Sequence, residues 1–135
     1  MRSLFSTKYS AGAFNTALLL LRLVAAGIML KHGYEKLSDF DGTLKFVSGL
    51  FSSYSKVLTI LLIFAEFFCA ILLLIGLFTR LACIPLIIAM LVVTIKFHHN
   101  DFIDHGETAT LYLGCYLAIL LVGPGRISID SMIGK

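Results

Sequence analysis

The chain has 135 residues, of which 59% are hydrophobic and 14% charged, and its formal net charge is +3. Soluble domains are about 45–50% apolar and about 25% charged, and a chain this short has too small an interior to bury the apolar excess. This excludes an ordinary soluble domain, and the scattered basic residues exclude the clustered basic surface of a nucleic-acid-binding protein. We predict an all-α, single membrane domain over residues 1–135 that contacts the lipid bilayer and no nucleic acid.

Four segments approach the length that a membrane span requires. A helix needs about 20 mainly apolar residues to cross the hydrocarbon layer. We predict spans over residues 14–34, 57–78, 81–97 and 107–123. Arg22 interrupts the first apolar run and three more spans follow it, which argues against a cleaved signal peptide. The sequence therefore predicts an integral, multi-pass four-helix bundle.

The segment between the first two spans has the pattern of one helix face. Its apolar residues recur every three or four positions: Leu37, Phe40, Leu44, Val47, Leu50, Phe51 and Tyr54. Ser38, Asp39 or Asp41 could cap the start of such a helix. Because the segment is too short and too polar to span, we predict an interfacial amphipathic helix over about 39–54. A loop with accidental periodicity is the alternative.

Four spans would place both termini and the Thr79–Arg80 connection on one side of the membrane. Apart from Arg22, the Lys and Arg residues divide equally between the two membrane sides, five on each, so the positive-inside rule does not decide the orientation. Six of the eight acidic residues lie on the side opposite the termini. The net charge therefore favours cytoplasmic termini.

Two ionisable residues lie deep within the predicted spans. Arg22 and Glu66 are each about 12–14 Å from a membrane face at 1.5 Å per residue, and antiparallel helices could bring them together. A charge at this depth costs about 2.5–3.5 kcal/mol on insertion scales and suggests a function. We predict that they form a buried polar pair, which either binds a ligand or only sets the helix register.

A second polar group gathers where the spans end opposite the termini. It comprises His32, Lys36, Lys96, His98, His99, His105 and Glu107, and so includes all four histidines. Histidine exchanges protons near neutral pH, which is suited to a proton exit beside a quinone or redox site. These residue types also bind Zn²⁺ or Cu²⁺, but the spacing of a helical metal site is absent and we predict no metal. A solvated membrane boundary that collects polar residues is the alternative.

The order of several short motifs resembles that of the DoxX family. They are Arg22, then Gly33 and Lys36 in G-Y-E-K-L, Phe40, Glu66, Leu73, Gly76, Arg80 in L-F-T-R, and the ending Gly123-Pro124-Gly125 with Ser128-Ile129-Asp130. The resemblance extends from about residue 15 to residue 131. It implies a bacterial inner-membrane protein with four helices and cytoplasmic termini. The family takes its name from a small subunit of a thiosulfate:quinone oxidoreductase, and some members associate with redox partners.

From the residues and the resemblance together, we expect a membrane component of a quinone-linked redox complex. A bound quinone and redox-protein partner subunits would go with that function, and a homo-oligomer is compatible with it. The alternative is a non-catalytic membrane scaffold or assembly partner whose segment 39–54 docks another protein. The sequence does not determine whether the chain is an enzyme by itself.

Overall fold

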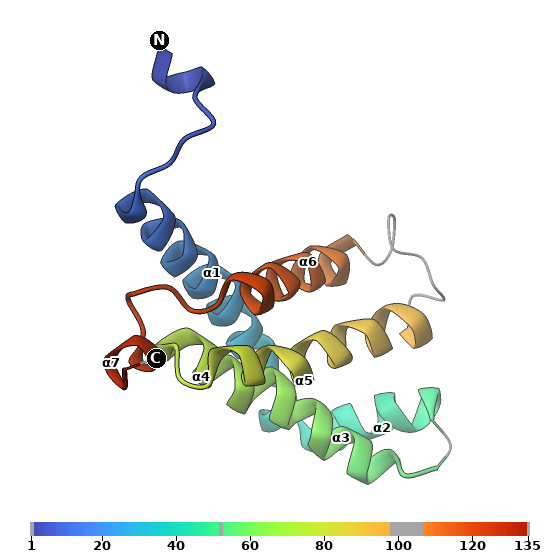
Figure 1. Ribbon diagram of the computed structural model, residues 1–135. Helices are drawn as coiled ribbons and strands as arrows, with labels where there is room; N and C mark the ends of the chain where they lie inside the picture. The colour runs from blue at the N-terminus through green and yellow to red at the C-terminus, as the bar shows by residue number, and fades with distance from the viewer. Residues whose placement is uncertain (1, 52, 98–106, 135) are drawn as a thin grey trace.

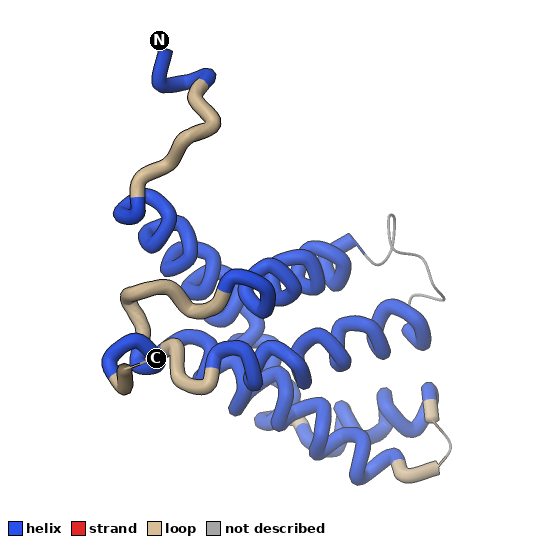
Figure 2. Tube along the Cα trace, in the orientation of Figure 1, coloured by secondary structure: helices blue, strands red, loops and turns tan. Residues whose placement is uncertain are grey.

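The computed structural model describes residues 2–51, 53–97 and 107–134, and within these ranges the chain is all-helical, with no strand (Figures 1 and 2). The elements are η1 (Arg2–Phe5), α1 (Ala11–Ser38), α2 (Phe40–Leu50), α3 (Ser55–Ile63), the π-helical η2 (Phe64–Cys69), α4 (Ala70–Ile75), α5 (Thr79–Val92), the π-helical η3 (Val93–Phe97), α6 (Glu107–Val122) and α7 (Ile129–Met132).

Two helices are long and apolar enough to cross a membrane, judged by length and composition. They are α1, with 28 residues, and the continuous helix from α3 through η2 to α4, Ser55–Ile75, with 21 residues. The apolar helices Thr79–Ile95 and Glu107–Val122 are shorter. The second long helix stops three residues before the predicted boundary, because Gly76 adopts a left-handed conformation with φ 77° and Leu77 N–H donates to Leu72 O.

Helix α2 occupies part of the predicted amphipathic segment. Of the three predicted capping residues, Asp39 is the one whose carboxylate accepts the Gly42 N–H, at 3.2 Å. The helix ends at Leu50, earlier than predicted, and Tyr54 follows in a left-handed conformation, with 79% of its surface exposed. Val47 is buried, and α2 packs against α3.

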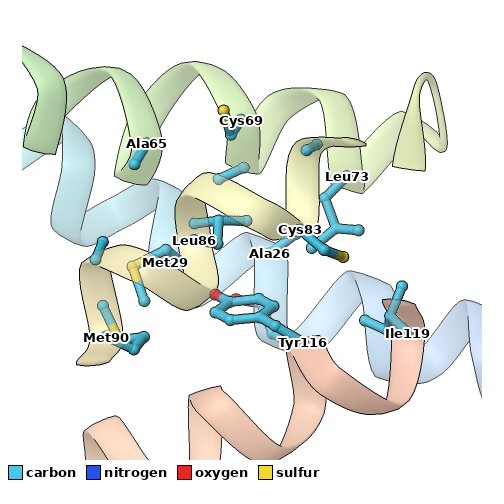
Figure 3. Packing of buried hydrophobic residues seen from close by; sticks show 14 of the residues in the cluster. Ala26, Met29, Ala65, Cys69, Leu73, Cys83, Leu86, Met90, Tyr116 and Ile119 are labelled. Carbon is cyan, nitrogen blue, oxygen red and sulfur yellow. The ribbon is translucent and has the colours of Figure 1, made fainter. Parts of the chain in front are cut away.

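The longer helices pack in a closed cycle. Helix α1 contacts α4, η2 and α6, while α5 contacts α4, η2 and α6 in turn. Their contacting faces carry small side chains and a few large ones, as Figure 3 shows: Ala26, Met29, Ala65, Cys69, Leu73, Cys83, Leu86, Met90, Tyr116 and Ile119. Small residues allow helices to approach closely, which is the packing mode that operates inside a membrane.

The outward faces of these helices are apolar. Large side chains such as Leu61, Leu81, Leu111 and Leu121 are more than half exposed. A monomeric soluble protein rarely presents contiguous apolar surface on this scale. The outer surface is therefore suited to lipid rather than water, in agreement with the composition.

Candidate functional site

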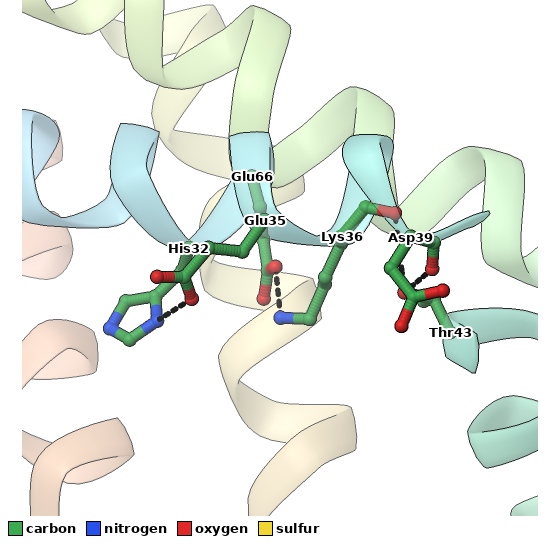
Figure 4. Close-up of polar contacts among 6 residues, drawn as sticks. All are labelled: His32, Glu35, Lys36, Asp39, Thr43 and Glu66. Carbon is green, nitrogen blue, oxygen red and sulfur yellow. Dashed lines mark hydrogen bonds and ion pairs between the residues drawn. The ribbon is translucent and has the colours of Figure 1, made fainter.

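Glu66 lies in the π-helical segment η2, in the middle of the second long helix. Single-turn π segments occur frequently at functional sites. The residue is 1% exposed, and its Oε2 accepts a hydrogen bond from Nζ of Lys36 on α1 (Figure 4). The Lys36 side chain is 28% exposed. The ion pair therefore connects the apolar interior with the accessible end of α1.

Gly33 allows α1 and η2 to come into backbone contact at this level. A Cβ atom at Gly33 would lie 2.5 Å from the backbone oxygen of Glu66, closer than real Cβ atoms come. Gly33 and Lys36 are three residues apart and hence lie on the same face of α1. The missing side chain at Gly33 therefore lets the neighbouring lysine reach Glu66.

Aromatic and imidazole groups extend the site toward α6. The rings of His32 and Tyr112 meet edge-on with centroids 6.4 Å apart, and Tyr112 stacks on Tyr116 at 6.0 Å. The Tyr116 hydroxyl donates to Ala25 O at 3.3 Å. His32 and Lys36 are four residues apart on α1 and hence lie on the same face of that helix. The site thus brings together a carboxylate, an ammonium, an imidazole and two phenols, which can donate, accept and exchange protons.

Within the predicted histidine-rich cluster, the structure places His32 and Lys36 at this site. Nδ1 of His32 is 4.0 Å from Oε2 of Glu35, one turn further along α1. The structure does not describe the other three histidines, so the predicted proton exit remains a prediction.

The remaining members of that cluster lie on or between η3 and α6. Glu107 is exposed and begins α6, and Lys96 belongs to η3. His98, His99 and His105 lie outside the described residues. In the ranges that the structure does describe, no group of three or more His, Cys, Asp or Glu side chains could hold a metal ion.

Arg22 is buried as predicted, but the predicted pair between Arg22 and Glu66 is wrong. The Arg22 guanidinium donates instead to the carbonyl oxygens of Pro124 and Ile127, each at 2.7 Å, and to Leu74 O at 3.3 Å. The predicted pair rests on the depth of Arg22 and Glu66 in the membrane, counted from the end of each predicted span. That count is valid only if both helices begin at the membrane faces. The antiparallel register instead sets Gly33 against Glu66, and Gly33 lies about 16 Å along α1 from Arg22.

The other motif residues surround Arg22 at the end of the molecule where α4 ends and α5 begins. We call this group the C-terminal clasp: Arg22, Gly76, Arg80, Gly123, Pro124, Gly125 and Asp130. Gly76 lies against Arg22, and a Cβ there would be 3.2 Å from Cζ of the guanidinium. Nη2 of Arg80 donates to Val122 O at 3.3 Å. The clasp therefore joins α1, α4, α5 and the chain that follows α6.

Asp130 caps helix α5 from a distant part of the sequence. Its two carboxylate oxygens accept the N–H groups of Phe78 and Thr79 at 2.8 and 2.9 Å. Phe78, at the cap position itself, provides no side-chain cap. Burial alone would raise the pKa of Asp130, but the hydrogen bonds from Thr79 and Phe78 and the charge of Arg22 lower it below its ordinary value.

Sequence reasoning missed the pairing of Lys36 with Glu66 and the contribution of Tyr112 and Tyr116. Because Lys36 follows the apolar run, the sequence places it in the polar group at the span ends and not beside Glu66. Its spacing of three from Gly33 was the available signal, since a glycine in a span marks close helix contact. The two tyrosines are four residues apart, which places them on one face of α6.

Comparison with known proteins identifies the family. The DoxX family model matches residues 17–99, which is more than half of the chain and includes both Lys36 and Glu66. The chain is also similar to "Inner membrane protein YphA" of Escherichia coli (strain K12), with 27% identity over 133 residues, covering 90% of this chain and 94% of that protein. No solved structure matches. The chain therefore belongs to the DoxX family of membrane proteins.

Proposed function

We propose that this protein crosses the bacterial inner membrane four times, with α1, the helix Ser55–Ile75, α5 and α6 as a four-helix bundle. The closed cycle of helix contacts and the apolar outward faces support this arrangement. The name of the Escherichia coli relative supports the inner membrane. In this arrangement α2 lies at the interface opposite the termini, and the termini are cytoplasmic.

Within the bundle, the protein binds a quinone as the membrane component of a quinone-linked redox complex. The observation that carries this proposal is the ion pair between the buried Glu66 and the half-buried Lys36. A charged group within a membrane span costs free energy and commonly marks a functional site. An apolar cavity of about 330 Å³ between α2, the second long helix and α5 supports it. Phe64 and Ala65, the two residues before Glu66, line that cavity.

The apolar lining of this cavity fits the tail of a quinone. Ligand cavities are typically about 300–1,000 Å³, mostly apolar, with a few placed polar groups. Walls such as Val47, Phe64 and Ala89 would surround the apolar tail. Lys36 and Glu66 do not line this cavity, and in the proposal the ring lies beyond its edge, where Lys36 would donate to a ring oxygen. A bound quinone supplies two-electron, two-proton redox chemistry. The chain would contribute a proton-holding group at the Glu66 carboxylate and exclude water with its apolar walls.

The test is the quinone content of the purified full chain, measured by mass spectrometry of its lipid extract. We expect quinone with the wild type and at least about tenfold less with Lys36→Met, because a charge-assisted hydrogen bond is lost. Ala89→Phe should have the same effect, because the added ring fills the cavity. Leu111→Phe adds the same ring on the outer face of α6, where the residue is 65% exposed, and should retain the quinone.

Retention of wild-type quinone by both Lys36→Met and Ala89→Phe would refute the site. Helix content and elution volume show whether each variant is folded. The alternative function is a non-catalytic scaffold that uses α2 as a docking helix. That function has less support. It depends on the apolar face of α2, and Val47, in the middle of that face, is buried within the molecule. A wild-type chain free of quinone that retains a stable protein partner would favour it.

A further inference from the structure

A second cavity lies at the opposite end of the molecule from α2. It has a volume of about 570 Å³, opens at the surface, and is lined by the start of α5, the chain that follows α6, and α7. Arg80 and Arg126 both line it, one from α5 and one from the segment after the Gly-Pro-Gly turn. Two segments that are distant in the sequence thus build one hollow that both arginines line.

The two arginines leave this cavity positively charged. Arg80 uses Nη2 to bond Val122 O, and Arg126 uses only its backbone N–H, which donates to Asn15 Oδ1 at 2.8 Å. Among the described residues, no carboxylate lies within ion-pair distance of either guanidinium. Asp130 also lines the cavity, and both of its oxygens accept N–H groups at the start of α5. The two arginines outnumber this carboxylate, so the lining keeps a net positive charge.

We propose that this cavity binds the phosphate group of an anionic ligand through Arg80 and Arg126. The planar guanidinium fork matches phosphate oxygens and forms charge-assisted hydrogen bonds with them. The cavity lies where α5 begins and α6 ends, which is the level of the membrane surface in the four-span arrangement. Exposed Leu81 lines it and is suited to contact with acyl chains. An anionic phospholipid and a soluble phosphate compound share this chemistry.

The experiment measures binding to the full chain in a neutral detergent, by native mass spectrometry and by thermal unfolding. The probes are phosphatidylglycerol, the zwitterionic phosphatidylcholine, and inorganic phosphate against chloride at equal ionic strength. We expect Arg126→Gln to weaken binding by about tenfold, because it removes a charge-assisted contact. Its side chain makes no internal hydrogen bond in the described structure, so the variant should fold. Lys8→Gln removes an equal charge near the N-terminus and should bind like the wild type.

Three results are informative. Preference for phosphatidylglycerol that Arg126→Gln weakens supports the site and identifies a lipid. Stabilisation by inorganic phosphate that Arg126→Gln abolishes supports the site and identifies a soluble ligand. Equal binding of the two lipids with no effect of phosphate, or wild-type affinity in both Arg126→Gln and Arg80→Gln, would overturn the proposal.

Discussion

At the residue scale, one absent side chain decides which charges meet. Gly33 lets the backbone of α1 rest on the backbone of η2, and Lys36 reaches Glu66 as a result. The contact is with a main-chain oxygen, which cannot move aside as a flexible side chain could. Gly27, two turns earlier in the same helix, has open space where its Cβ would be.

We expect Gly33→Ala to destabilise the protein and Gly27→Ala not to. Gly33→Ala should lower the free energy of unfolding by about 1–3 kcal/mol, because the added methyl overpacks the helix contact. Gly27→Ala should leave it unchanged or raise it by up to about 1 kcal/mol, the ordinary gain in helix propensity. Denaturation in mixed micelles, followed by circular dichroism, measures both. Equal stability of the two variants would show that the close helix contact is absent.

At the element scale, helix α5 depends on a residue far along the chain for its start. Asp130 accepts the first free N–H groups of α5 and also faces the buried charge of Arg22. The interaction stabilises the ionised carboxylate in the folded state. Because the folded pKa lies below the unfolded one, this stabilisation is present above the ordinary carboxyl pKa of about 4 and is lost as the pH falls through the folded value.

The cap therefore predicts an acid-sensitive contribution to stability. The wild type should lose about 1 kcal/mol, the usual worth of a helix cap, as the pH falls below about 4. Asp130→Asn should be less stable than the wild type at pH 7 and should lack this part of the pH dependence. Unfolding measured between pH 3 and 7 tests both points. Asp41→Asn, which removes an equal charge from the exposed face of α2, is the control, and the same profile in both variants would contradict the cap.

At the scale of the whole molecule, the four-span arrangement assigns every connection to a membrane side. The start of α1 and the C-terminal clasp lie at one end of the helices, whereas α2 and the start of α6 lie at the other (Figure 1). With only two spans, α6 would start on the side of the termini. The side on which Glu107 lies therefore distinguishes four spans from two.

Labelling of introduced cysteines with a membrane-impermeant maleimide tests the four-span arrangement. We expect Tyr54→Cys and Glu107→Cys to react in intact spheroplasts, and Lys8→Cys to react only in inverted vesicles. The native thiols serve as the background, since Cys69 and Cys83 are buried and Cys115 is half-buried. Glu107→Cys and Lys8→Cys reacting from the same side would rule out the four-span arrangement.

Several features could be predicted from the sequence because they depend on local composition. The apolar excess indicated a membrane protein, and helices begin or end near Asp39 and the Gly-Pro-Gly turn, where short-range capping and turn preferences act. The burial of Arg22 and Glu66 also followed, since each lies within a long apolar run.

The tertiary structure alone decided which partners those residues have. Glu66 pairs with Lys36, Arg22 binds carbonyl groups of the C-terminal clasp, and Asp130 caps α5. Each of these contacts depends on the register between helices, and hydropathy is nearly unchanged when one helix slides along another by a turn. Register is set by close contacts such as that of Gly33 with Glu66, which joins segments that are distant in the sequence. The sequence by itself therefore determined the environment and the helices, and long-range packing determined the chemistry of the site.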